Sequence, residues 1–530
     1  MPHLSVTCSA LVLAALLVPA SGVAQAEDVS TWEPPCSTPD SSPASEAPDP
    51  DSTSDSAPVS ITEQASPATG PAFDADFTGS AMRLDYYHSG IAGEEHVSPD
   101  RVRIEGAWPG SRTHLEDTLG LGKYRFRVED AADGRLLYSQ GFSSIYGEWE
   151  TTGEAKSGVW RTFHESLRFP EPRRPARVIL EKRAEGESFR SIFQARLGPD
   201  CRVIDRSPVP AVGKVVEVFE NGPAAEKVDL LFLGDGYTAA EEEKFRADLT
   251  RLTGYLFDSE PFASYRGRFN VRGLFVPSPE SSGSGITNPR AVDPPGGIWR
   301  ATPFGLSYNA FDSDRYVLTE ANRRLRELAA QAPYDALVLM ANSRKYGGGG
   351  IYNLWTTTAA DSAEAAYLLV HEFGHSFAGL ADEYYTSQVA YEDFHGSAEP
   401  SEPNATLNTD PTTLKWKEFI TEGTPVPTPW NQDAYDAAVL AYQEKRTALR
   451  EAGASEEELE ALFKEVRRVT GPMLEAEEHY GEVGAFEGAS YQAKGLYRPA
   501  LDCIMFSRNT DAFCPVCSHA IERVIESYGD

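Results

Sequence analysis

Residues 363–385 constrain this chain more than any other segment, because they combine a helical pattern with side chains that bind metal ions. Ala, Leu and Glu fill the first half, which favours a helix, and Gly379 marks its C-terminal end. Inside it, His371, Glu372 and His375 form the pattern H-E-x-x-H. Positions i and i+4 of a helix lie on one face, so both imidazoles can reach one zinc ion. Glu372 is then placed to activate a water on that ion.

Two imidazoles do not complete such a site, since a catalytic zinc ion takes three protein ligands and keeps a fourth position open. Gly379 permits the chain to turn back, and Asp382 and Glu383 follow directly. Carboxylate oxygens bind zinc, so both acids are candidates for the third ligand. The same pattern also arises by chance on a solvated helix face. The apolar residues 367–370 before it and the glycine turn after it favour a metal site.

The size and charge of the chain exclude several classes of protein. At 530 residues it exceeds one ordinary core, which predicts two folded domains with a tail or linker. Its net charge of −32 argues against binding nucleic acid, since a phosphate-binding surface needs clustered Lys and Arg. Outside the N-terminus, no run of about 20 apolar residues indicates a membrane span.

The first residues have most features of an export signal. An apolar stretch at 10–18 is followed by a small-x-small sequence at 24–26, although no Lys or Arg precedes the apolar stretch. Residues 1–26 are therefore predicted to be a signal peptide, and the protein to be secreted into the periplasm or the medium. Residues 27–70 contain Ser, Pro, Asp, Glu and Ala without any Lys or Arg, which predicts a disordered linker.

Residues 71–210 show the pattern of a β-domain. Short segments alternate apolar and charged residues, as in residues 124–128, and Gly, Pro and Asp-Gly turns separate them. This pattern predicts an N-terminal β-sandwich. We find no catalytic constellation in it.

Residues 211–530 follow a different pattern, in which apolar strands alternate with longer helices, as in an α/β layered domain. The predicted strands are 228–233, 269–276, 334–340 and 351–356, and the predicted helices before the H-E-x-x-H segment are 238–256 and 314–330. Residues 433–478 are rich in Ala, Glu, Leu and Lys and predict a helical hairpin broken at Gly453 and at Gly471-Pro472. We expect this hairpin to be a surface insertion covering about 433–482.

The stretch H-E-F-G-H-S-F-A-G-L-A-D-E-Y at 371–384 resembles the IgA-peptidase family of bacterial metalloendopeptidases, the igalysins, within the metzincins. Further segments with the same resemblance are L-F-L-G-D-G-Y at 231–237, K-W-K at 415–417, G-T-P-V-P-T-P at 423–429, G-L-Y-R-P at 495–499, C-I-M at 503–505 and F-C-P-V-C at 513–517. The resemblance covers most of residues 73–530. It implies a mixed α+β and α/β fold, with the β-sandwich followed by a metzincin-like zincin catalytic domain containing a mixed sheet and an active-site helix.

The resemblance also implies roles for particular residues. Met505 matches the methionine that packs beneath the metal in metzincins, and residues 351–356 match the sheet edge that binds an extended substrate antiparallel to it. The chain departs from the common spacing H-E-x-x-H-x-x-G-x-x-H, because its glycine, Gly379, falls one residue later. Asp382 stands in the place of the final histidine, which makes it the expected third ligand. Glu383 remains a competitor, or braces the turn through a hydrogen bond or salt bridge.

The cysteines of the C-terminal segment allow two arrangements. In an exported protein, Cys503 is expected to form a disulfide with Cys514 or Cys517, which would pin the methionine turn to the final helix. The alternative is a second, structural zinc site made by these three cysteines and His519.

These features predict a secreted zinc-dependent endopeptidase that hydrolyses protein or peptide substrates. His371, His375 and Asp382 would hold the Zn²⁺, and Glu372 would take a proton from the zinc-bound water and pass it to the leaving amine. The candidates for stabilising the oxyanion are Tyr384, Tyr385, Tyr497 and Arg498, in no order. The competing hypothesis is an adhesin or glycan-binding surface protein with a vestigial zinc site. Neither the substrate nor the oligomeric state follows from the sequence, and the family name does not make immunoglobulin A the substrate.

Overall fold

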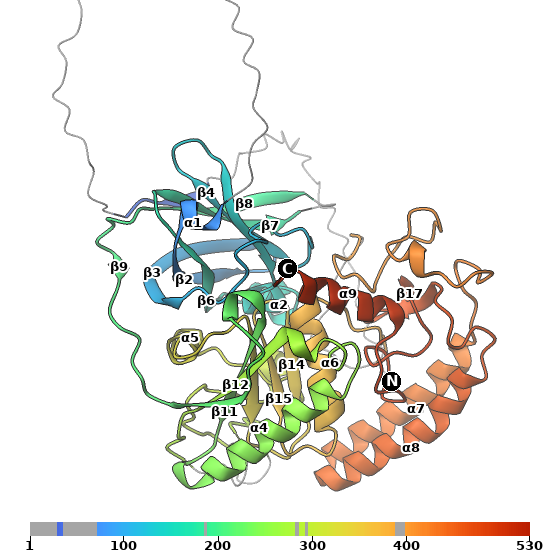
Figure 1. Ribbon diagram of the computed structural model, residues 1–530. Coiled ribbons are helices and arrows are strands. Elements are labelled where there is room, and N and C mark those ends of the chain that lie inside the picture. The colour runs from blue at the N-terminus through green and yellow to red at the C-terminus, as the bar shows by residue number, and fades with distance from the viewer. Residues whose placement is uncertain are drawn as a thin grey trace, which may run out of the picture.

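The computed structural model describes residues 29–34, 72–184, 188–280, 286–291, 295–386 and 398–529. The predicted signal peptide at 1–26 and most of the predicted linker lie outside the described residues. The fold is a mixture of α and β structure with several sheets, as predicted (Figure 1). Among the described helices, none is long and apolar enough to cross a membrane.

Two sheets make up the N-terminal region, the upper blue-to-teal part of Figure 1. One has the strand order β1-β8-β7-β4-β5 and the other β6-β2-β3-β9. The strands are β1 (Ser30–Trp32), β2 (Phe77–Ile91), β3 (Glu94–Ala107), β4 (Tyr124–Asp130), β5 (Leu136–Phe142), β6 (Arg161–Pro172), β7 (Ala176–Arg183), β8 (Phe189–Leu197) and β9 (Ile204–Asp205), with short helices α1 (Phe73–Asp76), α2 (Ile145–Trp149) and α3 (Gly153–Lys156).

The two N-terminal sheets share one core because their strands alternate buried and more exposed residues. In β4, Tyr124, Phe126 and Val128 are buried and the arginines between them are half-buried. The ring of Phe126 lies 6.1 Å from that of Phe169 on β6, which belongs to the other sheet. Apolar side chains of both sheets therefore stabilise the region together.

The predicted disorder of residues 27–70 is wrong for residues 30–32. Strand β1 pairs in parallel with β8, from Ser30 opposite Phe193 to Trp32 opposite Ala195. Trp32 also packs against the core. A free strand edge on β8 offers main-chain hydrogen bonds to any segment that reaches it, and the polar composition of the segment does not reveal this.

The second region is built on a six-stranded sheet with the order β10-β12-β11-β13-β15-β14. The strands are β10 (Lys214–Phe219), β11 (Val228–Asp235), β12 (Phe269–Phe275), β13 (Ala336–Ala341), β14 (Gly348–Ile351) and β15 (Trp355–Ala359). The four central strands are parallel, and both edge strands are antiparallel to their neighbours. Strands predicted at 228–233, 269–276 and 334–340 are confirmed as β11, β12 and β13. Nearly every residue of these three strands is buried, as is typical of parallel strands covered on both faces.

Two predictions in this region are wrong. The segment 351–356 is not one strand, because β14 ends at Ile351 and the chain turns through Asn353 (φ 54°) into β15. The edge strand next to β15 is therefore β14. The helix predicted at 314–330 is limited to α5 (Asn322–Ala329), because Tyr316 and Leu318 form β-bridges with Gly348 and Ser307.

Helices and a hairpin complete this region. Helix α4 (Glu242–Phe257) and helix α6 (Ala365–Ala378) pack on the sheet and on each other, and α9 (Pro515–Glu526) contacts α6. The strands β16 (Phe486–Ala489) and β17 (Gln492–Arg498) form an antiparallel hairpin.

The predicted helical hairpin is present as α7 (Gln432–Glu451) and α8 (Glu456–Glu475), the orange pair in Figure 1. The break at Gly453 is confirmed, with a φ of 68°. The break predicted at Gly471-Pro472 is wrong, because α8 continues to Glu475. Burial of Gly471 and Leu474 holds the last turn, although the ring of Pro472 removes one backbone donor.

Candidate metal centre

Helix α6 places the three residues of the H-E-x-x-H pattern at the bottom of a cleft. The Nε2 atoms of His371 and His375 lie 3.2 Å apart. Each ring uses its Nδ1 elsewhere: His371 donates to the Ile504 carbonyl at 2.9 Å, and His375 to the Leu380 carbonyl at 2.6 Å. A carbonyl only accepts, so each Nδ1 carries a proton, and the two Nε2 atoms are left facing each other.

Asp382 joins the two histidines because the chain reverses after α6. Gly379 caps the helix with a φ of 61°, the left-handed conformation that glycine adopts without strain. The Oδ1 atom of Asp382 then lies 3.0 Å from Nε2 of His371 and 3.2 Å from Nε2 of His375. Two imidazole nitrogens and one carboxylate oxygen are thus brought together, and this group is able to hold a metal ion.

Tyr491 supports Asp382, and the sequence analysis did not identify it. Its hydroxyl donates to Oδ2 of Asp382, which leaves Oδ1 for the histidines. Tyr491 and Ser490 form the turn between β16 and β17 with positive φ values of 67° and 47°. Their backbone amides donate to the carbonyls of Tyr384 and Asp382 at 3.1 and 2.9 Å. The turn contains no Gly or Asn, so it lacks the usual signature of such hairpins.

Glu383 points away from the histidines. Its Oε1 accepts hydrogen bonds from Asn404 Nδ2 at 3.0 Å and from the Cys517 thiol at 3.2 Å, and its amide donates to the Met505 carbonyl at 2.8 Å. The structure therefore separates the two acids that the sequence left in competition. The hydrogen bond expected of a bracing Glu383 is present.

The charges at the centre suit a cation. Burial lowers the pKa of His375, but the adjacent Asp382 carboxylate outweighs burial and raises that pKa to about 9. Burial raises the pKa of Asp382, but the two histidines outweigh it and hold that pKa well below the ordinary value. The site thus stabilises positive charge between these groups, as a metal-ligand set must.

Glu372 differs from Asp382 in its environment. Burial raises the pKa of Glu372, while the charges of His371 and His375 oppose the rise. A carboxylate with a raised pKa is a stronger base than an exposed one, which suits proton transfer near neutral pH.

Met505 packs against helix α6. It is fully buried, and a Cβ atom on Gly374 of α6 would lie only 3.1 Å from its sulfur. The preceding carbonyl, that of Ile504, accepts the hydrogen bond from His371. The turn therefore positions one of the two imidazoles.

The cleft around the centre is lined by parts of the chain far apart in sequence. Its lining includes Gly122, Ser143 and Glu148 of the N-terminal region, Gly348 and Gly350 of β14, and Tyr435, Val439, Tyr442, Arg446 and Phe463 of α7 and α8. The N-terminal region also holds the turn after β14, since Ser143 N donates to the Tyr352 carbonyl at 2.9 Å. The α7–α8 hairpin, expected to be a surface insertion, forms a wall of the cleft.

One side of the cleft carries positive charge. Arg446 is 8% exposed, and its Nε and one Nη atom have no hydrogen-bond partner among the described residues. Burial, with the neighbouring Arg315, lowers its pKa to about 9. An unpaired buried guanidinium is costly and favours a carboxylate as its ligand.

Of the four candidates for stabilising an oxyanion, only Tyr384 lines the cleft. Its ring stacks near His371, and its hydroxyl accepts from Arg315 at 3.4 Å. The hydroxyl of Tyr385 donates to Asp436 at 2.7 Å, and fully buried Arg498 donates to the Gly488 carbonyl at 2.7 Å. Tyr497 lies outside the cleft lining.

Gly350→Ala is expected to destabilise the protein, because β14 lies directly against α6. A Cβ at this position would be 2.1 Å from the Glu372 carbonyl oxygen and 2.9 Å from Cβ of His375. Overpacking of this kind costs about 1–3 kcal/mol or more, which urea unfolding measures. The control is Gly254→Ala in α4, where a Cβ meets no atom within 4 Å and stability should rise by up to about 1 kcal/mol. Equal stabilities of the two variants would contradict the close approach.

Two models of known protein families match the chain. Residues 216–525, more than half of the chain, match the family described as IgA Peptidase M64, and residues 72–194 match the Peptidase M64 N-terminus. No curated protein matches the chain. The first match includes all residues of the metal centre, and the second covers most of the two-sheet region. The chain therefore belongs to the IgA peptidase M64 family and is a metallopeptidase.

Proposed function

We propose that the protein is a secreted zinc-dependent endopeptidase with His371, His375 and Asp382 as metal ligands and Glu372 as general base. The observation that carries the proposal is the convergence of two Nε2 atoms and one Oδ1, at 3.0 to 3.2 Å, in an open cleft. Two imidazoles and a carboxylate are a donor set of catalytic zinc sites. Export rests on the signal sequence, and N-terminal sequencing of the protein from culture medium tests it.

Each group at the metal centre has a separate role in the proposed hydrolysis. A zinc ion held here would polarise the scissile carbonyl and lower the pKa of a water molecule. Glu372 accepts the proton of that water and delivers it to the leaving amine. Tyr384, which lines the cleft beside Arg315, is the group we propose to stabilise the oxyanion.

We propose that substrate binds as an extended strand along β14. This strand forms the edge of the six-stranded sheet, and Gly348 and Gly350 line the cleft next to Glu372. Main-chain pairing at a sheet edge does not require a chain end, so it supports endopeptidase activity. In this proposal a β-sandwich at about 71–210 precedes a metzincin-like domain at about 211–530, and the sandwich supplies one wall of the cleft.

Arg446→Gln is expected to weaken the binding of substrates with an acidic side chain near the scissile bond. A hydrogen-bonded charged pair contributes about 1.5–3 kcal/mol, so KM for an acidic peptide should rise about tenfold or more. KM for the matched peptide with Gln in place of Glu should change little. The comparison uses both peptides with both enzymes, and equal KM changes would contradict a carboxylate-binding Arg446.

The substrate class is tested by incubating the enzyme with immunoglobulin A and with a mixed proteome, then sequencing the new termini. We expect internal cleavages in several proteins, absent when Glu372→Gln replaces the wild type. Equal digestion by both would reassign the activity. If neither cuts, the adhesin hypothesis gains support.

A further inference from the structure

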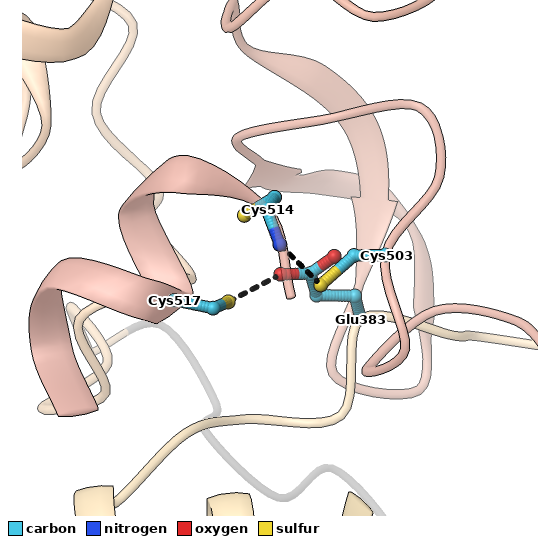
Figure 2. Close-up of side chains that lie close together, drawn as sticks. All are labelled: Glu383, Cys503, Cys514 and Cys517. Carbon is cyan, nitrogen blue, oxygen red and sulfur yellow. Dashed lines mark hydrogen bonds between the residues drawn. The ribbon is translucent and has the colours of Figure 1, made fainter. Parts of the chain in front are cut away.

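A second group of ligand-type side chains lies next to the metal centre, and the mechanism does not use it. Figure 2 shows Glu383, Cys503, Cys514 and Cys517 facing one another. Each offers one ligand atom, and these atoms lie within 4.8 Å of one another. All four residues are buried, with exposed fractions of 5% or less. They come from three segments: the loop after α6, the methionine turn and the N-terminus of α9.

The carboxylate of Glu383 is incompletely satisfied. Oε1 accepts from Asn404 and Cys517, but Oε2 has no hydrogen-bond partner among the described residues. The side chain is 0% exposed. A buried carboxylate oxygen without a donor is strongly unfavourable unless it has a proton or a cation as partner. Oε2 is therefore open to a proton or a cation as its partner.

The three thiols are free, so the disulfide expected between Cys503 and Cys514 or Cys517 is not present. The sulfur of Cys503 accepts a hydrogen bond from the Cys514 amide at 3.3 Å. A disulfide that includes Cys517 would remove the thiol that donates to Glu383, and a disulfide between Cys503 and Cys514 would leave Oε2 of Glu383 without a partner. A metal ion would instead bind all four side chains as ligands.

We propose that Glu383, Cys503, Cys514 and Cys517 form a second, structural metal site that takes Zn²⁺. Three sulfurs and one carboxylate oxygen make a closed four-coordinate set, which distinguishes structural zinc sites from catalytic ones. Cys514 and Cys517 have the C-x-x-C spacing common to such sites. They lie at the N-cap and in the first turn of α9, where the helix dipole offsets part of the negative charge.

The sequence analysis considered His519 as the fourth ligand of such a site. In the structure, Glu383 and not His519 lies with the three cysteines. The His519 side chain is 48% exposed, and its ring packs near Phe419. It is absent from the described group of ligand atoms. His519 therefore serves as a matched control rather than as a ligand.

The second site would position the first, a consequence that rests on the proposed function. Asp382 and Glu383 are consecutive, so adjacent carboxylates reach the two sites. Cys503 precedes Ile504, whose carbonyl holds His371, and the Glu383 amide donates to the Met505 carbonyl. A metal ion that joins the loop after α6, the methionine turn and α9 would fix the positions of Asp382 and of the His371 imidazole.

The test is the zinc content of the purified full-length chain, measured by mass spectrometry of the metal. We expect two zinc ions per wild-type chain, one in His371→Ala and one in Cys517→Ser, while His519→Ala keeps both. X-ray absorption of the His371→Ala chain should show sulfur at about 2.3 Å from zinc. Peptide mapping without reduction should find the three thiols unlinked, a measurement that stands even if Cys517→Ser does not fold.

Loss of all zinc from His371→Ala, or a disulfide among the three cysteines, would overturn the proposal. A wild-type chain with one sulfur-bound zinc that survives His371→Ala would instead contradict the catalytic metal and support this site. The two proposals therefore fail separately.

Discussion

Glu372→Gln is expected to lower kcat/KM for a protein substrate by about 10²–10⁴-fold without changing the zinc content. The amide has nearly the shape of the carboxylate, but it cannot accept the proton. Glu372 lines the cleft beside His371 and His375, and its burial raises its pKa, so it is the base closest to the proposed reaction. Turnover of a quenched peptide and metal analysis of the same samples measure both quantities.

A variant of a second acid on the cleft wall serves as the control. It removes a negative charge but leaves the proposed general base in place. Glu402 also lines the cleft, but it lies in a loop outside the metal centre. Glu402→Gln should therefore keep kcat within about threefold of the wild type, well short of the loss of a general base. A similar loss in both variants would show that charge alone explains the effect of Glu372→Gln.

Asp382→Ala is expected to release the catalytic zinc and reduce peptidase activity to background. Two imidazoles alone form an incomplete site, and the variant also removes the negative charge that the histidines face. Zinc should fall from two ions per chain to one, and the remaining ion should be sulfur-bound. Retention of both ions in active Asp382→Ala would contradict its assignment as third ligand.

Tyr491→Phe is the matched comparison for Asp382→Ala. It removes the hydroxyl that donates to Oδ2 and keeps the carboxylate. Loss of a partner that orients a ligand typically weakens metal affinity by 10–100-fold. We therefore expect this variant to bind zinc and turn over substrate at saturating metal, but to lose zinc at a lower chelator concentration than the wild type. An unchanged chelator midpoint would show that Tyr491 does not orient Asp382.

Local rules were sufficient to predict helix α6, which carries the candidate ligands His371 and His375, and the central strands of the sheet. The position of α6 follows from helix-forming residues and the glycine after them, and the shared face of His371 and His375 follows from their spacing. The apolar runs of β11, β12 and β13 identified buried strands. Each of these inferences depends on residues within a few positions of one another.

The sequence by itself thus determined the family, through the motifs that resemble it, and it determined helix α6 with its H-E-x-x-H residues, because short-range spacing and propensity specify a helix and its faces. Only the tertiary structure decided which acid faces the histidines, and which residues support it. The hydroxyl of Tyr491 is 109 positions from Asp382, and the thiol of Cys517 is 134 positions from Glu383. No periodicity in the chain encodes such pairs, since they depend on how the loop after α6, the methionine turn and α9 pack together. The opposite directions of Asp382 and Glu383 follow from that packing, and so does the second cluster of ligand atoms.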